Sequence, residues 1–256
     1  MIVADPQSHN VKMEKIHEKE FKECLEKTIR GYHKINTEPI KESVWEGILA
    51  KSMGKAGIAH KWIPGSHKPG ADIYVDSIGI SCKSTKQEQK TILKISSYRM
   101  TTIFTIDEFI REIDEVRGAN FQYYGVLSRV ESKDKKNLVY SVYMIPASKI
   151  KAFGLEWKDK KTKKGKMIWD TKMKDGMRMY ISEAMSNQLW ISLNKQRFAE
   201  YLIIENLQIS VEDTELDYAD LFDLLSLSDR PSSPSPSDNA ATAAAAPSAP
   251  EALVPA

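Results

Sequence analysis

Apolar and polar residues alternate through residues 72–75 and again through 80–83, and this alternation predicts a β-hairpin. Side chains along a strand point to opposite faces with period two. One face would therefore be apolar (Ile73, Val75, Ile80 and Cys82) and the other polar (Asp72, Tyr74, Ser81 and Lys83). With a turn at residues 76–79, Val75 would lie opposite Ile80, and Asp72 opposite Lys83 with Cβ atoms about 5 Å apart.

Periodicity elsewhere predicts helices around this hairpin. Residues 11–35 have the pattern of an amphipathic helix interrupted near Gly31, with Ile16, Phe21, Cys24, Leu25 and Ile29 as its apolar positions. Residues 37–39 are expected to start a second helix, which carries Trp45 and Glu46. Thr105 is the expected cap of a third helix over residues 105–113, with Glu108 completing a capping box.

Residues 121–130 and 138–146 are rich in β-branched and aromatic residues and are expected to add two strands to the sheet of the hairpin. The order of helix, helix, hairpin, helix and strands indicates an α/β fold with a central mixed β-sheet flanked by helices.

The facing Asp72 and Lys83 suggest two alternatives. A carboxylate and a main-chain carbonyl, here that of Cys82, can bind Mg2+, and a nearby ammonium can orient or deprotonate a water that attacks a phosphodiester. The alternative is a cross-strand ion pair, which would contribute little to stability if exposed.

The run Pro69-Gly70-Ala71-Asp72, followed by Cys82-Lys83, resembles the active-site hairpin of the PD-(D/E)xK nucleases, above all type II restriction endonucleases. The resemblance implies a restriction-endonuclease-like fold and Mg2+-dependent cleavage of double-stranded DNA at a short site, leaving 5′-phosphate ends. It also implies a cognate DNA methyltransferase as a partner in the same system. The chain departs from the family pattern at Ser81, where an Asp or Glu is expected.

A glutamate elsewhere would then have to supply the missing charge. Glu46, on the helix before the hairpin, is the first candidate, and Glu88, after the second strand, is the other. We expect Asp72, Lys83 and Glu46 as catalytic residues, and Asp72, Glu46 and the carbonyl of Cys82 as metal ligands.

Small donors and cations near the hairpin are typical of phosphate contacts. Ser81 and Lys86 are candidate DNA-binding residues, as are Ser97 and Arg99 in the hydroxyl-rich segment 94–102, which otherwise fits a loop or helix cap. The basic run 158–166 lies between Trp157 and Trp169 and contributes Lys163 and Lys164. Segments 186–190 and 194–197 offer amides and an arginine that could read bases or cap helices.

Charge is distributed unevenly along the chain. Residues 211–256 hold nine acids and one base, which leaves 36 bases and 26 acids, a net charge of +10, for residues 1–210. The net positive charge of residues 1–210 favours a polyanionic partner. We expect a nuclease domain over 1–210, an acidic amphipathic segment over 211–229, and a disordered Pro/Ser/Ala-rich tail over 230–256.

Two cysteines give no disulfide framework, and no signal peptide or membrane span is recognisable, so a cytoplasmic location is expected. A homodimer would suit a palindromic site. Three other functions stay open: a non-catalytic DNA-binding protein, a nicking or repair nuclease, or an unrelated protein in which Asp72 and Lys83 only brace the hairpin.

Overall fold

Helices and two β-sheets make up the part of the chain that the computed structural model describes. This part comprises residues 13–62, 70–87, 91–100, 105–116, 120–133, 136–161, 167–182 and 187–211. All of it lies within one unit, Met1–Leu216. The predicted tail over 230–256 lies outside the described residues, as does nearly all of the acidic segment over 211–229.

The first sheet has the strand order β1-β2-β3-β5-β6-β11. Its strands are β1 (Lys61–Trp62), β2 (Ile73–Val75), β3 (Ile78–Lys86), β5 (Tyr123–Glu131), β6 (Asn137–Pro146) and β11 (Leu202–Ser210). The neighbours β3 and β5 are parallel, and the other neighbours are antiparallel. The sheet is therefore mixed, and the strands expected over 121–130 and 138–146 are confirmed as β5 and β6.

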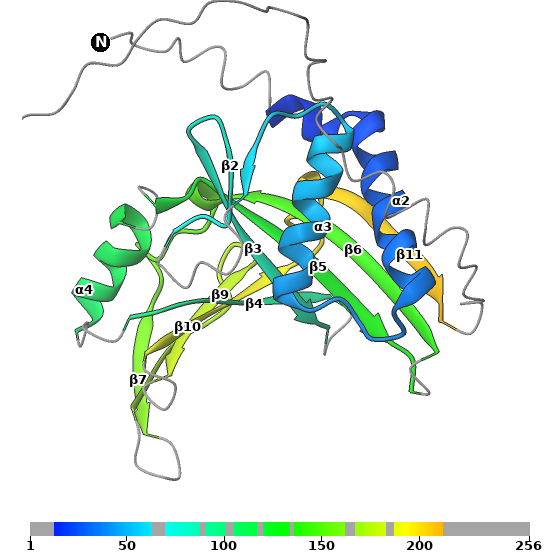
Figure 1. Cartoon of the computed structure of the whole chain (residues 1–256). Helices are drawn as coiled ribbons and strands as arrows, with labels where there is room; N and C mark the ends of the chain where they lie inside the picture. The colour runs from blue at the N-terminus through cyan, green and yellow to red at the C-terminus, as the bar shows by residue number, and fades with distance from the viewer. Residues whose placement is uncertain are drawn as a thin grey trace, which may run out of the picture. The chain divides into compact units, whose positions relative to one another are not determined.

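Two helices, α2 (Lys19–Ile35) and α3 (Glu42–Lys55), lie over one face of this sheet (Figure 1). Their apolar side chains share a core with the apolar face of the hairpin. The core residues include Phe21, Leu25, Ile29, Trp45, Leu49, Ile73, Val75, Ile80 and Cys82. The apolar face predicted for the hairpin is thus buried under the two helices.

Both helices begin later than their sequence pattern suggests. A short 3₁₀ turn, Lys15–His17, precedes α2, and the predicted break near Gly31 is wrong because the helix continues to Ile35. Buried Ile29 and His33 flank Gly31, and such packing offsets the roughly 1 kcal/mol that a helical glycine costs. The second helix begins at Glu42, since the preceding residues are held in an extended link by side chains of the sheet.

The second sheet is antiparallel and has the order β4-β10-β9-β8-β7. Its strands are β4 (Ile92–Arg99), β7 (Trp157–Lys161), β8 (Met167–Thr171), β9 (Met177–Ser182) and β10 (Gln188–Asn194). The composition of segment 94–102 left both a DNA contact and a loop or helix cap open, and residues 94–99 of it belong to strand β4. Buried Leu93, Ile95 and Ser97 alternate with the partly exposed Lys94 and Ser96, which gives β4 a core-facing side.

The second sheet shares a core with the face of the first sheet opposite α2 and α3. This core joins Tyr124, Val126 and Ile145 of the first sheet to Ile95, Met179, Ile191 and other residues of the second. The expectation of a mixed sheet holds, but helices α2 and α3 cover only one face of it. The other face is covered largely by strands, and α4 (Ile106–Arg111) adds Phe109 to the same core.

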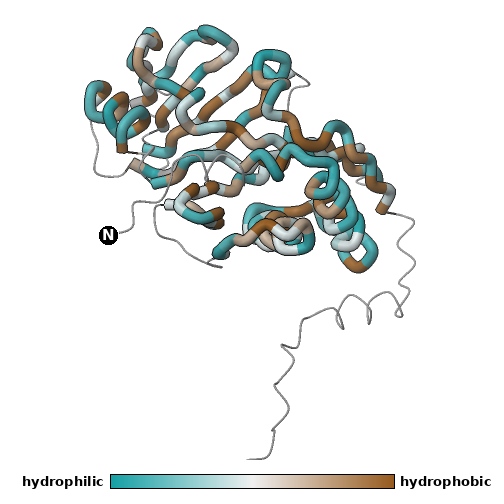
Figure 2. The backbone as a smooth tube through the Cα atoms, turned by 90° about the horizontal axis from the view of Figure 1, so that it is seen from above, coloured by the Kyte–Doolittle hydropathy of each residue, from teal (hydrophilic) through white to brown (hydrophobic). Residues whose placement is uncertain are grey.

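The capping box predicted at α4 is confirmed, because the Thr105 side chain accepts from the Glu108 N–H and the Glu108 carboxylate accepts from the Thr105 N–H. A π-helical turn, Glu112–Val116, follows α4, and 3₁₀ turns lie at Ala147–Lys149 and Ala199–Tyr201. In Figure 2 the chain changes between teal and brown along helices and strands alike, as amphipathic elements require. Among the described residues, no helix combines the length and apolarity needed to span a membrane.

Candidate active site

The hairpin of β2 and β3 has a tighter turn than its sequence suggests. Val75 pairs with Ile78, Tyr74 with Gly79, and Ile73 with Ile80. The predicted pairing of Val75 with Ile80, and hence of Asp72 with Lys83, is wrong by two residues, although both faces are preserved. Asp76 adopts a positive φ of 55°, which suits a two-residue hairpin turn and shortens the loop.

Asp72 is bound to the edge of β3 through its side chain and its backbone. Its N–H donates to the Ile80 carbonyl over 2.9 Å, and its Oδ2 accepts from the Cys82 N–H over 2.7 Å. In an extended strand the N–H and C=O of one residue point to the same side. The Cys82 carbonyl therefore points toward the edge where the Asp72 carboxylate lies.

Helix α3 is fixed against the first sheet by a buried tryptophan. The Trp45 side chain is fully buried, and its Nε1 donates to the Gly125 carbonyl of β5 over 2.9 Å. Glu42 and Glu46 lie four residues apart and so on one face of the helix. The Lys83 Nζ contacts the Glu42 Oε1 over 2.7 Å, which brings the start of α3 to the hairpin.

The structure thus assembles Asp72, Lys83 and Glu46 as a cluster and adds Glu42, which the sequence analysis missed. The signal for Glu42 was present, because it precedes Glu46 by one helical turn and the two carboxylates share a face. The tight contact between Lys83 and Glu42 replaces the direct cross-strand pairing of Lys83 with Asp72.

Three carboxylates around one ammonium leave the cluster with excess negative charge. Burial, followed by the charges of Asp72 and Glu42, raises the pKa of Glu46 to about 7. Burial also raises the pKa of Asp72, although the hydrogen bond from Cys82 and the charge of Lys83 oppose this rise. An additional cation would relieve this repulsion.

The Lys83 side chain is only 15% exposed. Burial alone would lower the pKa of Lys83, but the charge of Glu42, its hydrogen bond and the charge of Asp72 outweigh it, so that the pKa is raised. Lys83 is therefore protonated at neutral pH. Of the two functions expected for this lysine, orienting a water or phosphate oxygen fits its charge better than removing a proton.

The backbone of one residue, Ile40, positions the start of α3. The Ile40 N–H donates to the hydroxyl of Tyr140 over 3.1 Å, and the Ile40 carbonyl accepts from the Ser84 hydroxyl over 2.9 Å. Arg129 also donates to this carbonyl, over 3.4 Å. Strands β3, β5 and β6 each contribute one of these side chains, so the sheet holds the chain two residues before Glu42.

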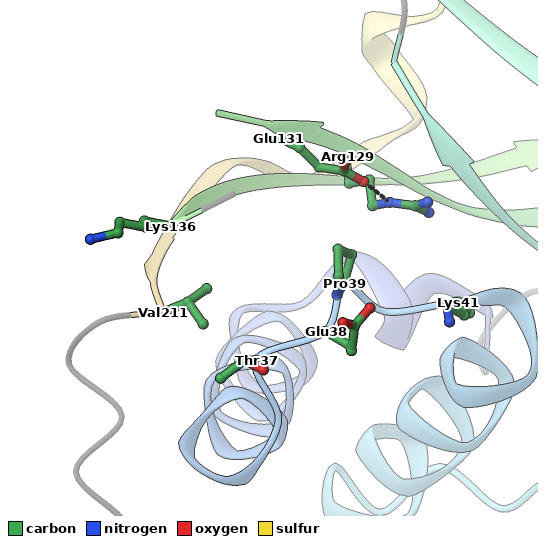
Figure 3. Close-up of a pocket in the computed structure, with 8 residues that line it drawn as sticks. All are labelled: Thr37, Glu38, Pro39, Lys41, Arg129, Glu131, Lys136 and Val211. Carbon is green, nitrogen blue, oxygen red and sulfur yellow. Dashed lines mark hydrogen bonds and ion pairs between the residues drawn. The ribbon is translucent and has the colours of Figure 1, made fainter. Parts of the chain in front are cut away.

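A cavity of about 370 Å³ lies beside this link (Figure 3). It is lined by the link between α2 and α3 and by the strand ends nearby, at Thr37, Glu38, Pro39, Lys41, Arg129, Glu131, Lys136 and Val211. Arg129 pairs with Glu131 over 2.8 Å on one wall. The lining of this cavity carries three cations, Lys41, Arg129 and Lys136, and two carboxylates, Glu38 and Glu131.

The candidate DNA-binding residues occupy different environments. Ser81 and Ser97 are only 5% and 8% exposed, and the Ser97 hydroxyl is hydrogen-bonded to that of Tyr124 over 3.0 Å. Lys86 is exposed and paired with Glu131, and Arg99 is exposed at the end of β4. Lys163, Lys164 and the alternative acid Glu88 lie outside the described residues.

Among the residues that the structure describes, His, Cys, Asp and Glu form no group of three or more that could hold a metal ion. A site at Asp72 and Glu46 would thus have two carboxylates and the Cys82 carbonyl. Comparison of the chain with protein-family models, curated proteins and solved structures finds no match.

Proposed function

We propose that this chain is a Mg2+-dependent type II restriction endonuclease that cleaves double-stranded DNA at a short specific site. The observation that carries the proposal is the cluster of Asp72, Glu46, Glu42 and Lys83, centred on an aspartate that is hydrogen-bonded to Cys82 N–H. The basic charge of residues 1–210 supports a polyanionic substrate.

The chemistry of these residues fits Mg2+. This ion prefers oxygen ligands, keeps several waters, and is commonly bound by one or two carboxylates together with substrate phosphates. Asp72, Glu46 and the Cys82 carbonyl would hold it, and the cation would offset the burial and the charges of Asp72 and Glu42 that raise the pKa of Glu46 to about 7. When bound, Mg2+ would supply Lewis acidity for phosphodiester hydrolysis.

The protein groups would have separate functions. Asp72 and Glu46 bind the cation, and Lys83 donates hydrogen bonds that orient the water or the scissile phosphate. Glu42 holds the Lys83 ammonium in place over 2.7 Å, so it is a positioning residue. The products would carry 5′-phosphate and 3′-hydroxyl ends.

The proposal is tested by incubating the purified chain with unmethylated plasmid and phage DNA of several sequences, with Mg2+ or with EDTA. We expect discrete Mg2+-dependent fragments whose ends share one sequence. Single-strand nicks alone would indicate a nicking enzyme. Intact DNA across all sequences would contradict the proposal.

A non-catalytic DNA-binding protein is the second candidate. Ser81 supports it, because this position carries no acid and is buried. This candidate predicts DNA binding that is equally tight in Mg2+ and in EDTA, without cleavage. A homodimer and a partner methyltransferase belong to the first proposal only.

A further inference from the structure

The outward face of the second sheet carries a row of side chains that the proposed active site does not use. Strand pairing places five residues opposite one another across all five strands: Lys158, Asp170, Tyr180, Trp190 and Ser96. Their neighbours along the strands, including Ile181, Leu189 and Ile191, are buried in the core. Because side chains alternate along a strand, the row lies on the opposite, outward face, where Asp170 is itself only 9% exposed.

An aromatic pair occupies the middle of this row. The rings of Tyr180 and Trp190 are parallel within 6°, with centroids 5.8 Å apart, and both side chains are only partly buried. The Lys94 Nζ lies 4.9 Å from the centroid of the Trp190 ring and 5.8 Å from that of the Tyr180 ring. Because both side chains are partly exposed, aromatic surface remains beside Lys94 for a further planar group.

Charge and hydrogen-bonding groups around the pair favour an anionic ligand. Among the described residues of this face, Lys94, Lys158 and Arg178 are cationic and Asp170 is the acid. Arg178 donates from Nε and Nη2 to both oxygens of Asp170, over 2.9 and 2.8 Å, which neutralises that carboxylate. Ser96 and Ser192 add hydroxyl donors beside Trp190 and Lys94.

We infer that this face binds an unpaired DNA strand, with bases stacked on Trp190 and Tyr180 and phosphates contacting Lys94 and Lys158. Aromatic side chains beside cations are the common means of binding single strands, because every base has a face that can stack. In a duplex the bases are stacked on one another and do not reach such a surface. None of these residues belongs to the nuclease cluster, whereas the choice of DNA over RNA rests on the proposed function.

Fluorescence anisotropy tests the inference with the full chain and a fluorescein-labelled oligothymidine in EDTA, which prevents Mg2+-dependent cleavage. Trp190→Ala should weaken binding by about 10- to 100-fold, the usual effect of removing one stacking partner. Trp190→Phe should retain most of the affinity. Phe153→Ala, at an aromatic that is 81% exposed outside the strands, is the matched control and should bind like the unaltered chain.

Lys94→Gln provides a second test that keeps the aromatic pair intact. It should weaken binding and reduce the dependence of affinity on salt, whereas Lys151→Gln, at an exposed position outside the strands, should do neither. Thermal unfolding of each variant verifies that it is folded.

Several results would overturn the inference: no binding of the oligonucleotide, unchanged binding by folded Trp190→Ala and Lys94→Gln variants, or a duplex bound as tightly through the same residues. Tighter binding of oligouridine than of oligothymidine would overturn the assignment to DNA. Plasmid cleavage is measured separately in Mg2+. Cleavage without single-strand binding refutes this inference alone, and single-strand binding without cleavage refutes the proposed nuclease alone.

Discussion

The Asp72 carboxylate accepts a hydrogen bond from the Cys82 N–H over 2.7 Å. This contact joins the residue before β2 to the residue that precedes Lys83 on β3. It fixes a carboxylate at the edge of the sheet where α3 presents Glu42 and Glu46. The candidate active site therefore depends on a hairpin edge and a helix face that one buried core holds together.

Asp72→Asn separates the structural function of Asp72 from its charge. The Asn side-chain oxygen can still accept from the Cys82 N–H, and the variant loses a charged carboxylate whose pKa is raised by burial, so we expect it to be at least as stable as the unaltered chain at neutral pH. Asp72→Ala leaves that N–H without its acceptor and should lower the free energy of unfolding by about 1 kcal/mol. Urea unfolding measures the difference. Loss of Mg2+-dependent cleavage in both variants would show that the charge is needed, whereas activity in Asp72→Asn would exclude Asp72 as an essential anionic ligand.

Glu42→Gln should lower the pKa of Lys83. Burial opposes the charged ammonium, and the Glu42 carboxylate is the foremost group that raises the pKa against it. A lysine whose pKa is raised on folding stabilises the protein fully below its unfolded pKa of 10.5, and this contribution is lost as pH rises through the folded value. In Glu42→Gln, Lys83 should therefore stabilise the folded protein less at alkaline pH than it does in the unaltered chain.

Amine labelling at pH 9, followed by mass spectrometry of the Lys83 peptide, measures the change. We expect faster labelling of Lys83 in Glu42→Gln, with Lys86 as the internal reference on the same strand. Equal labelling of Lys83 in both proteins would show that Glu42 does not raise the pKa of Lys83.

Glu46→Gln should raise stability at alkaline pH in EDTA. A carboxyl group whose pKa rises from 4.5 to about 7 on folding favours the folded state while it is protonated. Its contribution therefore falls as pH rises between these values, and Gln removes the repulsion from Asp72 and Glu42. The melting temperature of the variant should exceed that of the unaltered chain at pH 8 and lie close to it at pH 5.

Glu115→Gln, at an exposed position, is the control for loss of one carboxylate. Added Mg2+ should stabilise the unaltered chain more than Glu46→Gln. The opposite order, or a stability difference that does not change with pH, would argue against Glu46 in a crowded anionic cluster.

Tyr140→Phe should weaken the positioning of α3. The variant removes the acceptor of the Ile40 N–H and the partner of the His33 ring, 2.9 Å away. Leaving such buried groups unsatisfied costs about 1–3 kcal/mol. Ser84→Ala removes one donor to the Ile40 carbonyl, but Arg129 still donates to this carbonyl. The loss of stability in Ser84→Ala should therefore be smaller than in Tyr140→Phe. Urea unfolding of both variants ranks the two effects, and a larger loss in Ser84→Ala would contradict this account.

The buried and polar faces of the hairpin could be predicted from the sequence, because a period of two assigns the faces whatever the turn length. The register could not, since a two-residue turn and a four-residue turn keep the same faces and only the turn geometry at Asp76 distinguishes them. Local signals also sufficed at α4, where Thr105 and Glu108 form the capping box.

Long-range pairing explains what the sequence did not reveal. Residues 92–99 form β4 because they pair with β10, about 90 residues later, and local composition carries no trace of that partner. The contact of Glu42 with Lys83 likewise depends on Trp45 and the backbone of Ile40, which the sheet holds through residues far along the chain.

Single-turnover cleavage of plasmid DNA in Mg2+ by Lys83→Ala and Lys86→Ala tests the central claim most directly. The two lysines lie three residues apart on β3, but Lys83 belongs to the cluster and Lys86 pairs with Glu131. We predict that Lys83→Ala, verified as folded, slows cleavage by about 100-fold or more, as expected for a positioned catalytic group, while Lys86→Ala stays within a few-fold. Cleavage by Lys83→Ala at the unaltered rate would contradict the assignment of the active site to this hairpin.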